Sequence, residues 1–139
     1  MKPTTYLRLS TALTGAGTAF SGYLSTIRVS SGVCAFAEPC PFFLGYPACY
    51  TGLLLFVTMF VVSALSLARR SQTIVPAVAN AIVSALGVAF AGRMVAVELD
   101  SPVHQYKLGL PTCAYGLVFF VAVLIASLLA WLRRPKTSP

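Results

Sequence analysis

Four cysteines are the residues of this 139-residue chain best suited to chemistry. Cys34 and Cys40 lie close together in the segment VCAFAEPCPFF, whereas Cys49 and Cys113 lie in two similar segments, LGYPACYTGLLLF and LGLPTCAYGLVFF. Thiols form disulfides, exchange disulfides as thiolates and bind soft metal ions. The cysteines therefore predict redox or metal-binding chemistry if the fold brings them together in pairs.

The two similar segments belong to a longer internal repeat. Residues 44–70 align without a gap with residues 108–134, and both copies end in Arg-Arg. The regions before them also match, because AFSGYLSTIRV at residues 19–29 resembles AFAGRMVAVEL at residues 89–99. We therefore divide the chain into two tandem units, residues 1–70 and residues 71–139, in which Cys49 and Cys113 occupy equivalent positions.

The composition predicts a multi-pass protein of the cell membrane. The chain is 58% hydrophobic and 9% charged, whereas about a quarter of the residues of a soluble domain are charged. Four apolar stretches are long enough to cross a hydrocarbon layer of about 30 Å, and they cover residues 11–29, 47–68, 73–99 and 111–132. We expect an all-α bundle of four transmembrane helices, made of two helical hairpins related by a pseudo-two-fold axis along the membrane normal.

The net charge of +7 indicates an orientation in the membrane. Seven basic residues fall at the N-terminus, between the second and third spans, or at the C-terminus: Lys2, Arg8, Arg69, Arg70, Arg133, Arg134 and Lys136. Four spans place these segments on one side, and Lys and Arg gather on the cytoplasmic side. Both termini are therefore predicted to be cytoplasmic. The lipid bilayer is the expected partner, and nucleic acid is not.

Cys34 and Cys40 fall in the first predicted extracytoplasmic loop, residues 30–46. Disulfides persist on that side of a membrane, and closing so short a loop would stabilise the fold by ~2 kcal/mol. One interpretation is a static structural bridge. The other is a mobile redox pair that passes electrons between a partner and the bundle.

Pro47 and Pro111 predict where the second and fourth spans begin, because proline is tolerated at the first position of a helix. Cys49 and Cys113 would then lie in the first helical turn at matching depth. They could meet across the pseudo-axis if their Cα atoms came within about 7 Å, or they could be buried thiols that pack as small apolar side chains. Thiolates with Met94 or His104 would suit Cu(I), but no ligand spacing here is diagnostic, so no metal site is assigned.

The first and third spans are predicted to pack closely through small residues that recur every four positions, the pattern by which helices approach in lipid. These residues are Thr14, Thr18 and Gly22 in the first span and Ala77, Ala81, Ala85 and Ala89 in the third. Asn80, near the cytoplasmic end of the third span, predicts an interhelical hydrogen bond.

The segments TGAGTAFSGYLSTIRVSSGVCAFAEPC and GYPACYTGL resemble the first half of bacterial and archaeal members of the vitamin K epoxide reductase family. Members of that family have two loop cysteines, a G-x-P-x-x-x-x-G entry to the second span, and a C-x-x-C motif at the outer end of the fourth. That motif exchanges electrons with a quinone in the bundle. Here the fourth span begins with PTCAYGL, so Cys113 matches one cysteine and Gly116 stands in place of the other. We hypothesise that Cys49 replaces the missing thiol.

The resemblance implies an electron path. Cys34 and Cys40 would take electrons from a dithiol of an extracytoplasmic thioredoxin-like or other substrate protein, and Cys49 and Cys113 would pass them to quinone, the implied cofactor. Tyr115 would donate a hydrogen bond to a quinone carbonyl, or else be an ordinary interfacial tyrosine.

Arg93 lies inside the third span, at a depth where an ionisable residue usually has a role. It would favour a cysteine thiolate, or else extend to the membrane surface or pair with Glu98 or Asp100.

The function predicted first is a membrane thiol–disulfide oxidoreductase similar to vitamin K epoxide reductase and DsbB. Two alternatives stay open. One is a non-catalytic membrane subunit or scaffold that keeps a structural disulfide in its loop. The other is a small carrier of metal ions or thiol compounds that uses the paired intramembrane cysteines.

Overall fold

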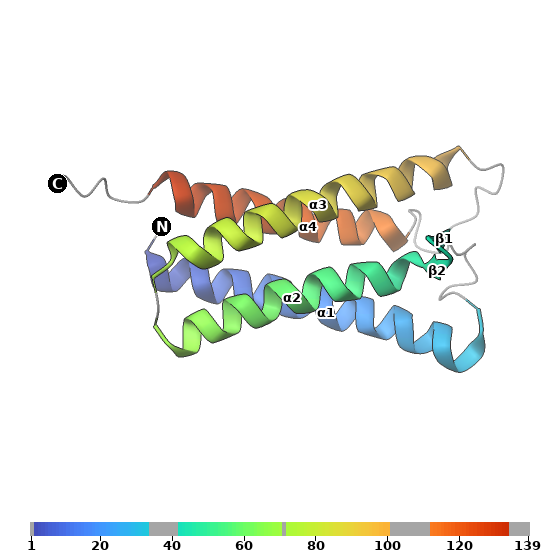
Figure 1. Ribbon diagram of the computed structural model, residues 1–139, viewed down its shortest axis with the longest axis horizontal. Helices are drawn as coiled ribbons and strands as arrows, with labels where there is room; N and C mark the ends of the chain where they lie inside the picture. Colours follow the sequence, from blue (N-terminus) through green and yellow to red (C-terminus); the bar gives the residue numbers. More distant parts are fainter. Residues whose placement is uncertain (1, 34–41, 71, 101–111, 134–139) are drawn as a thin grey trace.

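The computed structural model describes residues 2–33, 42–70, 72–100 and 112–133. They form an antiparallel four-helix bundle with one small β-hairpin (Figure 1). The helices are α1 (Pro3–Ser31), α2 (Ala48–Ala68), α3 (Ile74–Leu99) and α4 (Thr112–Leu132), and the strands are β1 (Phe42–Phe43) and β2 (Tyr46–Pro47). The predicted four-helix architecture is confirmed.

Three of the helices in the described ranges, α2, α3 and α4, are long and apolar enough to cross a membrane. Helix α1 has 29 residues, so it is long enough, but it carries many hydroxyl residues. It begins at Pro3, whose fixed φ suits the first helical position, rather than at residue 11 as predicted. It ends at Gly32, which has a left-handed φ of 72° and donates its N–H to the Arg28 carbonyl.

The β-hairpin of residues 42–47 was not predicted from the sequence. Strands β1 and β2 pair antiparallel, with Phe43 opposite Tyr46. Leu44 and Gly45 form the turn with φ of 52° and 84°, and a turn with two positive φ angles matches the twist of the strands. Helix α2 follows directly at Ala48, so Pro47 is its N-cap rather than its first residue.

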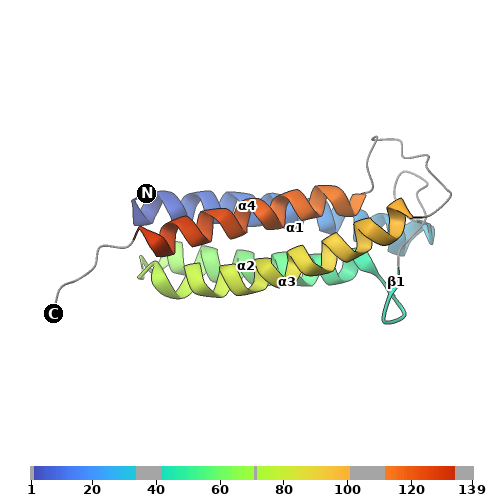
Figure 2. The same ribbon diagram turned by 90° about the horizontal axis from the view of Figure 1, so that it is seen from above.

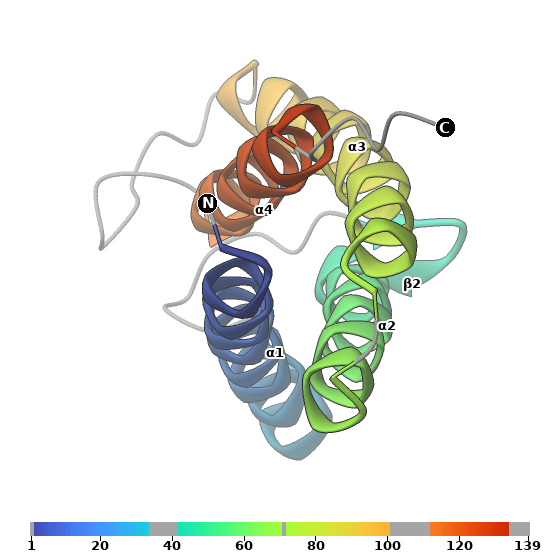
Figure 3. The same cartoon turned by 90° about the vertical axis from the view of Figure 1, so that its left-hand side faces the viewer.

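The four helices surround a common axis, and consecutive helices are neighbours (Figure 3). Helix α1 packs against α2 and α4, and helix α3 packs against the same two, so α2 and α4 are diagonally opposite. The start of α1, the α2–α3 connection and the end of α4 lie at one end of the bundle (Figure 1). We call it the basic end, because its described charged residues are all cationic: Lys2, Arg8, Arg69, Arg70 and Arg133.

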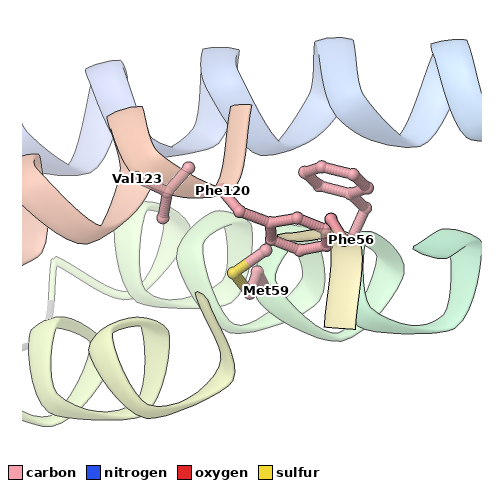
Figure 4. Packing of buried hydrophobic residues seen from close by; sticks show 5 residues of the cluster. Phe56, Met59, Phe120 and Val123 are labelled. Carbon is pink, nitrogen blue, oxygen red and sulfur yellow. The ribbon is translucent and has the colours of Figure 1, made fainter. Parts of the chain in front are cut away.

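The centre of the bundle is an apolar cluster of Phe56, Met59, Ala91, Phe120 and Val123 (Figure 4). The rings of Phe56 and Phe120, from the diagonal helices α2 and α4, are stacked with centroids 4.2 Å apart and planes 10° apart. These two phenylalanines are equivalent residues of the repeat, so the stack lies where a pseudo-two-fold axis would pass.

Each of the stacked rings also packs against a glycine of the neighbouring helix. A Cβ atom on Gly17 would lie 2.4 Å from the Phe56 ring, and a Cβ atom on Gly87 would lie 2.3 Å from the Phe120 ring. The α1–α2 and α3–α4 pairs therefore make the same close contact.

The buried face of α3 differs from the stripe of alanines that the sequence suggested. Ala77 is buried, but Ala85 and Ala89 are exposed, so the prediction is wrong for those two. A strict spacing of four residues drifts around a helix with 3.6 residues per turn. The face that stays inward alternates steps of three and four and contains Asn80, Ser84, Gly87, Ala91, Met94 and Glu98.

The polarity of the bundle is that of a protein in lipid. Small hydroxyl residues are buried between helices, including Ser10, Thr14 and Ser63. Large apolar residues at mid-helix positions point outward, including Leu54 at 67% exposure and Val118 at 67%. Because an apolar outer surface of this kind is unfavourable in water, the lipid bilayer is its expected surroundings.

Candidate functional site

Cys49 and Cys113 have the same place in their helices. Cys49 is the second residue of α2 and Cys113 is the second residue of α4. Both carry thiol groups and both are partly buried. The prediction that the two cysteines lie in first helical turns is confirmed.

Cys49 and Cys113 lie on the same faces of their helices as the two stacked phenylalanines. Cys49 precedes Phe56 by two helical turns, and Cys113 precedes Phe120 by the same spacing. Residues seven positions apart share one face of a helix, and Phe56 and Phe120 meet at the centre. The two thiols are therefore about 10 Å along their helices from the stacked rings, at the end opposite the basic end.

The diagonal arrangement of α2 and α4 sets a condition for a bond between these thiols. Neighbouring packed helices are about 8–10 Å apart, so diagonal helices in a square arrangement are farther apart. A disulfide needs Cα atoms within about 7 Å. A direct bond would need the first turns of α2 and α4 to approach one another. Otherwise, each of the two thiols would have to exchange separately with the same third thiol.

Aromatic rings run from the Cys113 end toward the centre. The ring of Tyr115 contacts Phe20 of α1, edge to face, with centroids 6.3 Å apart. Phe20 also contacts Phe119 at 6.4 Å, and Phe119 contacts Phe56 at 6.1 Å. We call Phe20, Phe56, Tyr115, Phe119 and Phe120 the aromatic cluster. It combines apolar aromatic rings with one phenol, and Tyr115 is two residues from Cys113 in the sequence.

Arg93 and Glu98 of α3 lie toward the same end. The Arg93 side chain is exposed, and it precedes Met94, which is buried on the inward face. Glu98 is only 5% exposed and lies on that inward face. The sequence reading treated Glu98 only as a partner for Arg93. Its spacing from Ala91 and Met94, seven and four residues, was the signal that it points inward.

The other predicted participants, Cys34 and Cys40, lie outside the described residues, as does His104. Among the described residues, no three His, Cys, Asp or Glu side chains come together in a group that could hold a metal ion.

A second group of polar residues lies near the basic end, about 20 Å along α2 from Cys49. We call it the polar layer, and all four helices contribute to it: Tyr6, Ser10, Ser63, Asn80 and Ser127. Each of these residues is at most 1% exposed. The interhelical hydrogen bonding predicted for Asn80 is confirmed.

Asn80 is the centre of the polar layer. Its Nδ2 group donates to Ser63 Oγ at 2.8 Å and to Ser10 Oγ at 2.9 Å. It also lies 3.3 Å from the Tyr6 hydroxyl, which is 3.0 Å from Ser127 Oγ. Ser10 and Ser63 hydrogen-bond to one another at 2.9 Å.

The opposite atom of the same amide, Asn80 Oδ1, is buried without a hydrogen-bond partner among the described residues. An Nδ2 group has two hydrogens for three nearby oxygens, so the layer is rich in acceptors on one side of the amide and lacks a donor on the other. The sequence alone does not predict this layer. Tyr6, Ser63 and Ser127 lie on different helices, and their contact depends on which face of each helix points inward.

The residues that could do chemistry therefore lie in two groups, one toward each end of the bundle. Thiols and aromatic rings gather at one end, neutral hydrogen-bonding groups gather at the basic end, and the Phe56–Phe120 stack lies between them. No family model, curated protein or solved structure matches this chain.

Proposed function

We propose that the chain is a membrane-embedded thiol–disulfide oxidoreductase that passes electrons from an extracytoplasmic dithiol to quinone. The observation that carries the proposal is the matched, partly buried position of Cys49 and Cys113 in the first turns of α2 and α4. Two thiols at one level beside an aromatic cluster are what a two-electron transfer to an apolar acceptor requires.

The proposed path has two exchanges. A dithiol on a thioredoxin-like substrate protein attacks the Cys34–Cys40 disulfide, so the substrate leaves as a disulfide and the two loop cysteines become thiols. Those thiols then reduce a Cys49–Cys113 disulfide in the same way. A bound quinone would take two electrons and two protons from the resulting thiol pair, which becomes a disulfide again.

Four side chains would support the last transfer. The flat surfaces of Phe20 and Phe119 would hold the ring of the acceptor beside the α4 helix, and the Tyr115 hydroxyl would donate a hydrogen bond to a carbonyl oxygen. Arg93 would supply positive charge near the outer end of the bundle, which favours the thiolate as the attacking form.

The proposal includes a membrane topology. All four helices would cross the bilayer, α1 among them, with the basic end in the cytoplasm because Lys and Arg gather there. Cys49 and Cys113 would then face the extracytoplasmic side, where a substrate protein can reach the loop cysteines. The resemblance of residues 14–55 to the vitamin K epoxide reductase family supports the same arrangement.

The direct test is turnover in a bilayer. The purified chain in nanodiscs would receive reduced thioredoxin as electron donor and ubiquinone-1 or menadione as acceptor, and loss of quinone absorbance would be followed. We expect activity in the unmodified chain, background rates for Cys49→Ser and Cys113→Ser, and unchanged rates for Ser66→Ala, whose hydroxyl donates to the Val62 carbonyl of its own helix. Full activity of Cys49→Ser would rule out its role in the relay.

A second candidate function, a non-catalytic membrane scaffold, is favoured by one observation. The two cysteines begin diagonal rather than neighbouring helices, an arrangement that suits separate thiols packing as small side chains. Under this candidate, no variant of Cys49 or Cys113 would change any electron transfer, and the functional element would be the bundle itself.

A further inference from the structure

The turn of the β-hairpin contains a residue that its backbone geometry disfavours. Leu44 has a φ of 52°, a left-handed conformation in which the Cβ of an L-residue crowds the following carbonyl oxygen. Asn, Asp or Gly is the usual first residue of such a turn. Gly45, at the second position with φ of 84°, follows that preference, and Leu44 does not.

Leu44 is also exposed. Its side chain is 85% exposed, more than any other large apolar side chain in the described part of the chain, and Tyr46 on the other side of the turn is 66% exposed. A leucine in water loses the hydrophobic gain that burial would give. Both the backbone conformation and the exposure are therefore unfavourable if water surrounds the turn.

The hairpin lies where lipid could surround it instead. It projects sideways from the bundle rather than across its end, as the two perpendicular views agree (Figures 2 and 3). It leads directly into α2 at Ala48, one of the helices apolar enough to cross a membrane. Residues 42–47 carry no charge, and tyrosine is enriched where membrane and water meet.

We propose that the turn of residues 44–46 is a lipid anchor, in which Leu44 inserts among the upper acyl chains of the bilayer and Tyr46 lies at headgroup level. Burial of Leu44 in lipid would offset both unfavourable features at once. The anchor would fix the start of α2, and with it the depth of Cys49, relative to the membrane surface. The proposal does not depend on any redox activity.

Tryptophan fluorescence tests the anchor, because the chain has a single tryptophan. Trp131→Phe provides a background without fluorescence from tryptophan, into which Leu44→Trp is introduced. Two reference variants are made in the same background. Leu54→Trp reports a lipid-facing position on α2, since Leu54 is 67% exposed at mid-helix, and Ser30→Trp reports an exposed polar position at the same end of the bundle.

Each variant would be reconstituted in phosphatidylcholine vesicles, with or without phosphatidylcholine brominated near the upper end of the acyl chain. We expect Leu44→Trp to have blue-shifted emission, to be quenched by the brominated lipid as Leu54→Trp is, and to be protected from aqueous iodide. Quenching of Leu44→Trp by iodide to the same degree as Ser30→Trp, with Leu54→Trp still quenched by lipid, would overturn the anchor. The turn would then be a surface open to a protein partner.

Discussion

Gly17 and Gly87 allow two phenylalanine rings to lie directly against the backbone of a neighbouring helix. An alanine Cβ at Gly17 would come within 2.4 Å of the Phe56 ring, and the stack with Phe120 restricts how far that ring can move. Overpacking of this kind typically costs about 1–3 kcal/mol. We predict that Gly17→Ala and Gly87→Ala each lower the free energy of unfolding in detergent micelles by about this amount.

Gly92 provides the matched control for these glycines. It lies in α3, and a Cβ atom there would meet no other part of the described residues within 4 Å, beyond its chain neighbours and the nearby backbone of α3. Gly92→Ala should therefore be neutral or should gain up to about 1 kcal/mol from helix propensity. Equal losses for Gly87→Ala and Gly92→Ala would mean that glycine flexibility, and not contact with Phe120, explains the effect.

A substitution at Tyr115 can separate the effect of ring packing from the effect of hydrogen bonding. Tyr115→Phe keeps a ring to contact Phe20 but removes the hydroxyl. If that hydroxyl binds a quinone carbonyl, losing a hydrogen bond of about 1 kcal/mol should slow quinone reduction roughly 5-fold to 10-fold. An unchanged rate would indicate an ordinary interfacial tyrosine.

At the scale of elements, the polar layer joins all four helices, and its strength can be measured through Asn80. Asn80→Ala removes the donor shared by Tyr6, Ser10 and Ser63. Interhelical hydrogen bonds in membranes contribute about 1 kcal/mol each, so the free energy of unfolding should fall by about 1–3 kcal/mol. Ser66→Ala, which removes a bond within one helix, should change it by less than about 0.5 kcal/mol. Equal effects would contradict a joining role.

The helices could be predicted from the sequence because a long apolar run has few other stable forms in lipid. The start of helix α1 was placed too late, at residue 11 instead of Pro3. Its polar residues, such as Ser10, are buried inside the bundle and lower the apolar character by which spans are recognised. The β-hairpin was missed because Leu44, an unusual first residue for its turn, hides the turn signal that Asn-Gly would give.

At the level of the whole molecule, the proposed topology requires α1 to cross the membrane. Single-cysteine variants Thr4→Cys and Ser30→Cys, in a chain with its native cysteines replaced by serine, would report the two ends of α1. Both positions are exposed. We predict that a membrane-impermeant maleimide labels Ser30→Cys in intact cells and labels Thr4→Cys only after lysis. Labelling of both from the same side would mean that α1 does not span.

The candidate site was only partly predictable. The equivalence of Cys49 and Cys113 followed from the repeat, and their helical position followed from Pro47 and the matching segment. The diagonal relation of α2 and α4 did not, because helix order around an axis depends on packing between faces that no single segment specifies. Inward-facing Glu98 was missed although its spacing from Ala91 and Met94 places it on the same face of α3.

The most direct test of the central claim is the oxidation state of Cys49 and Cys113 in the membrane. The protein would be treated with quinone or with reductant, alkylated, digested and analysed by mass spectrometry. We predict a pair of peptides joined by a Cys49–Cys113 disulfide after quinone treatment, and two alkylated thiols after reduction. If both cysteines are fully alkylated under every oxidising condition, the proposed electron path lacks its second pair of thiols and the account is wrong.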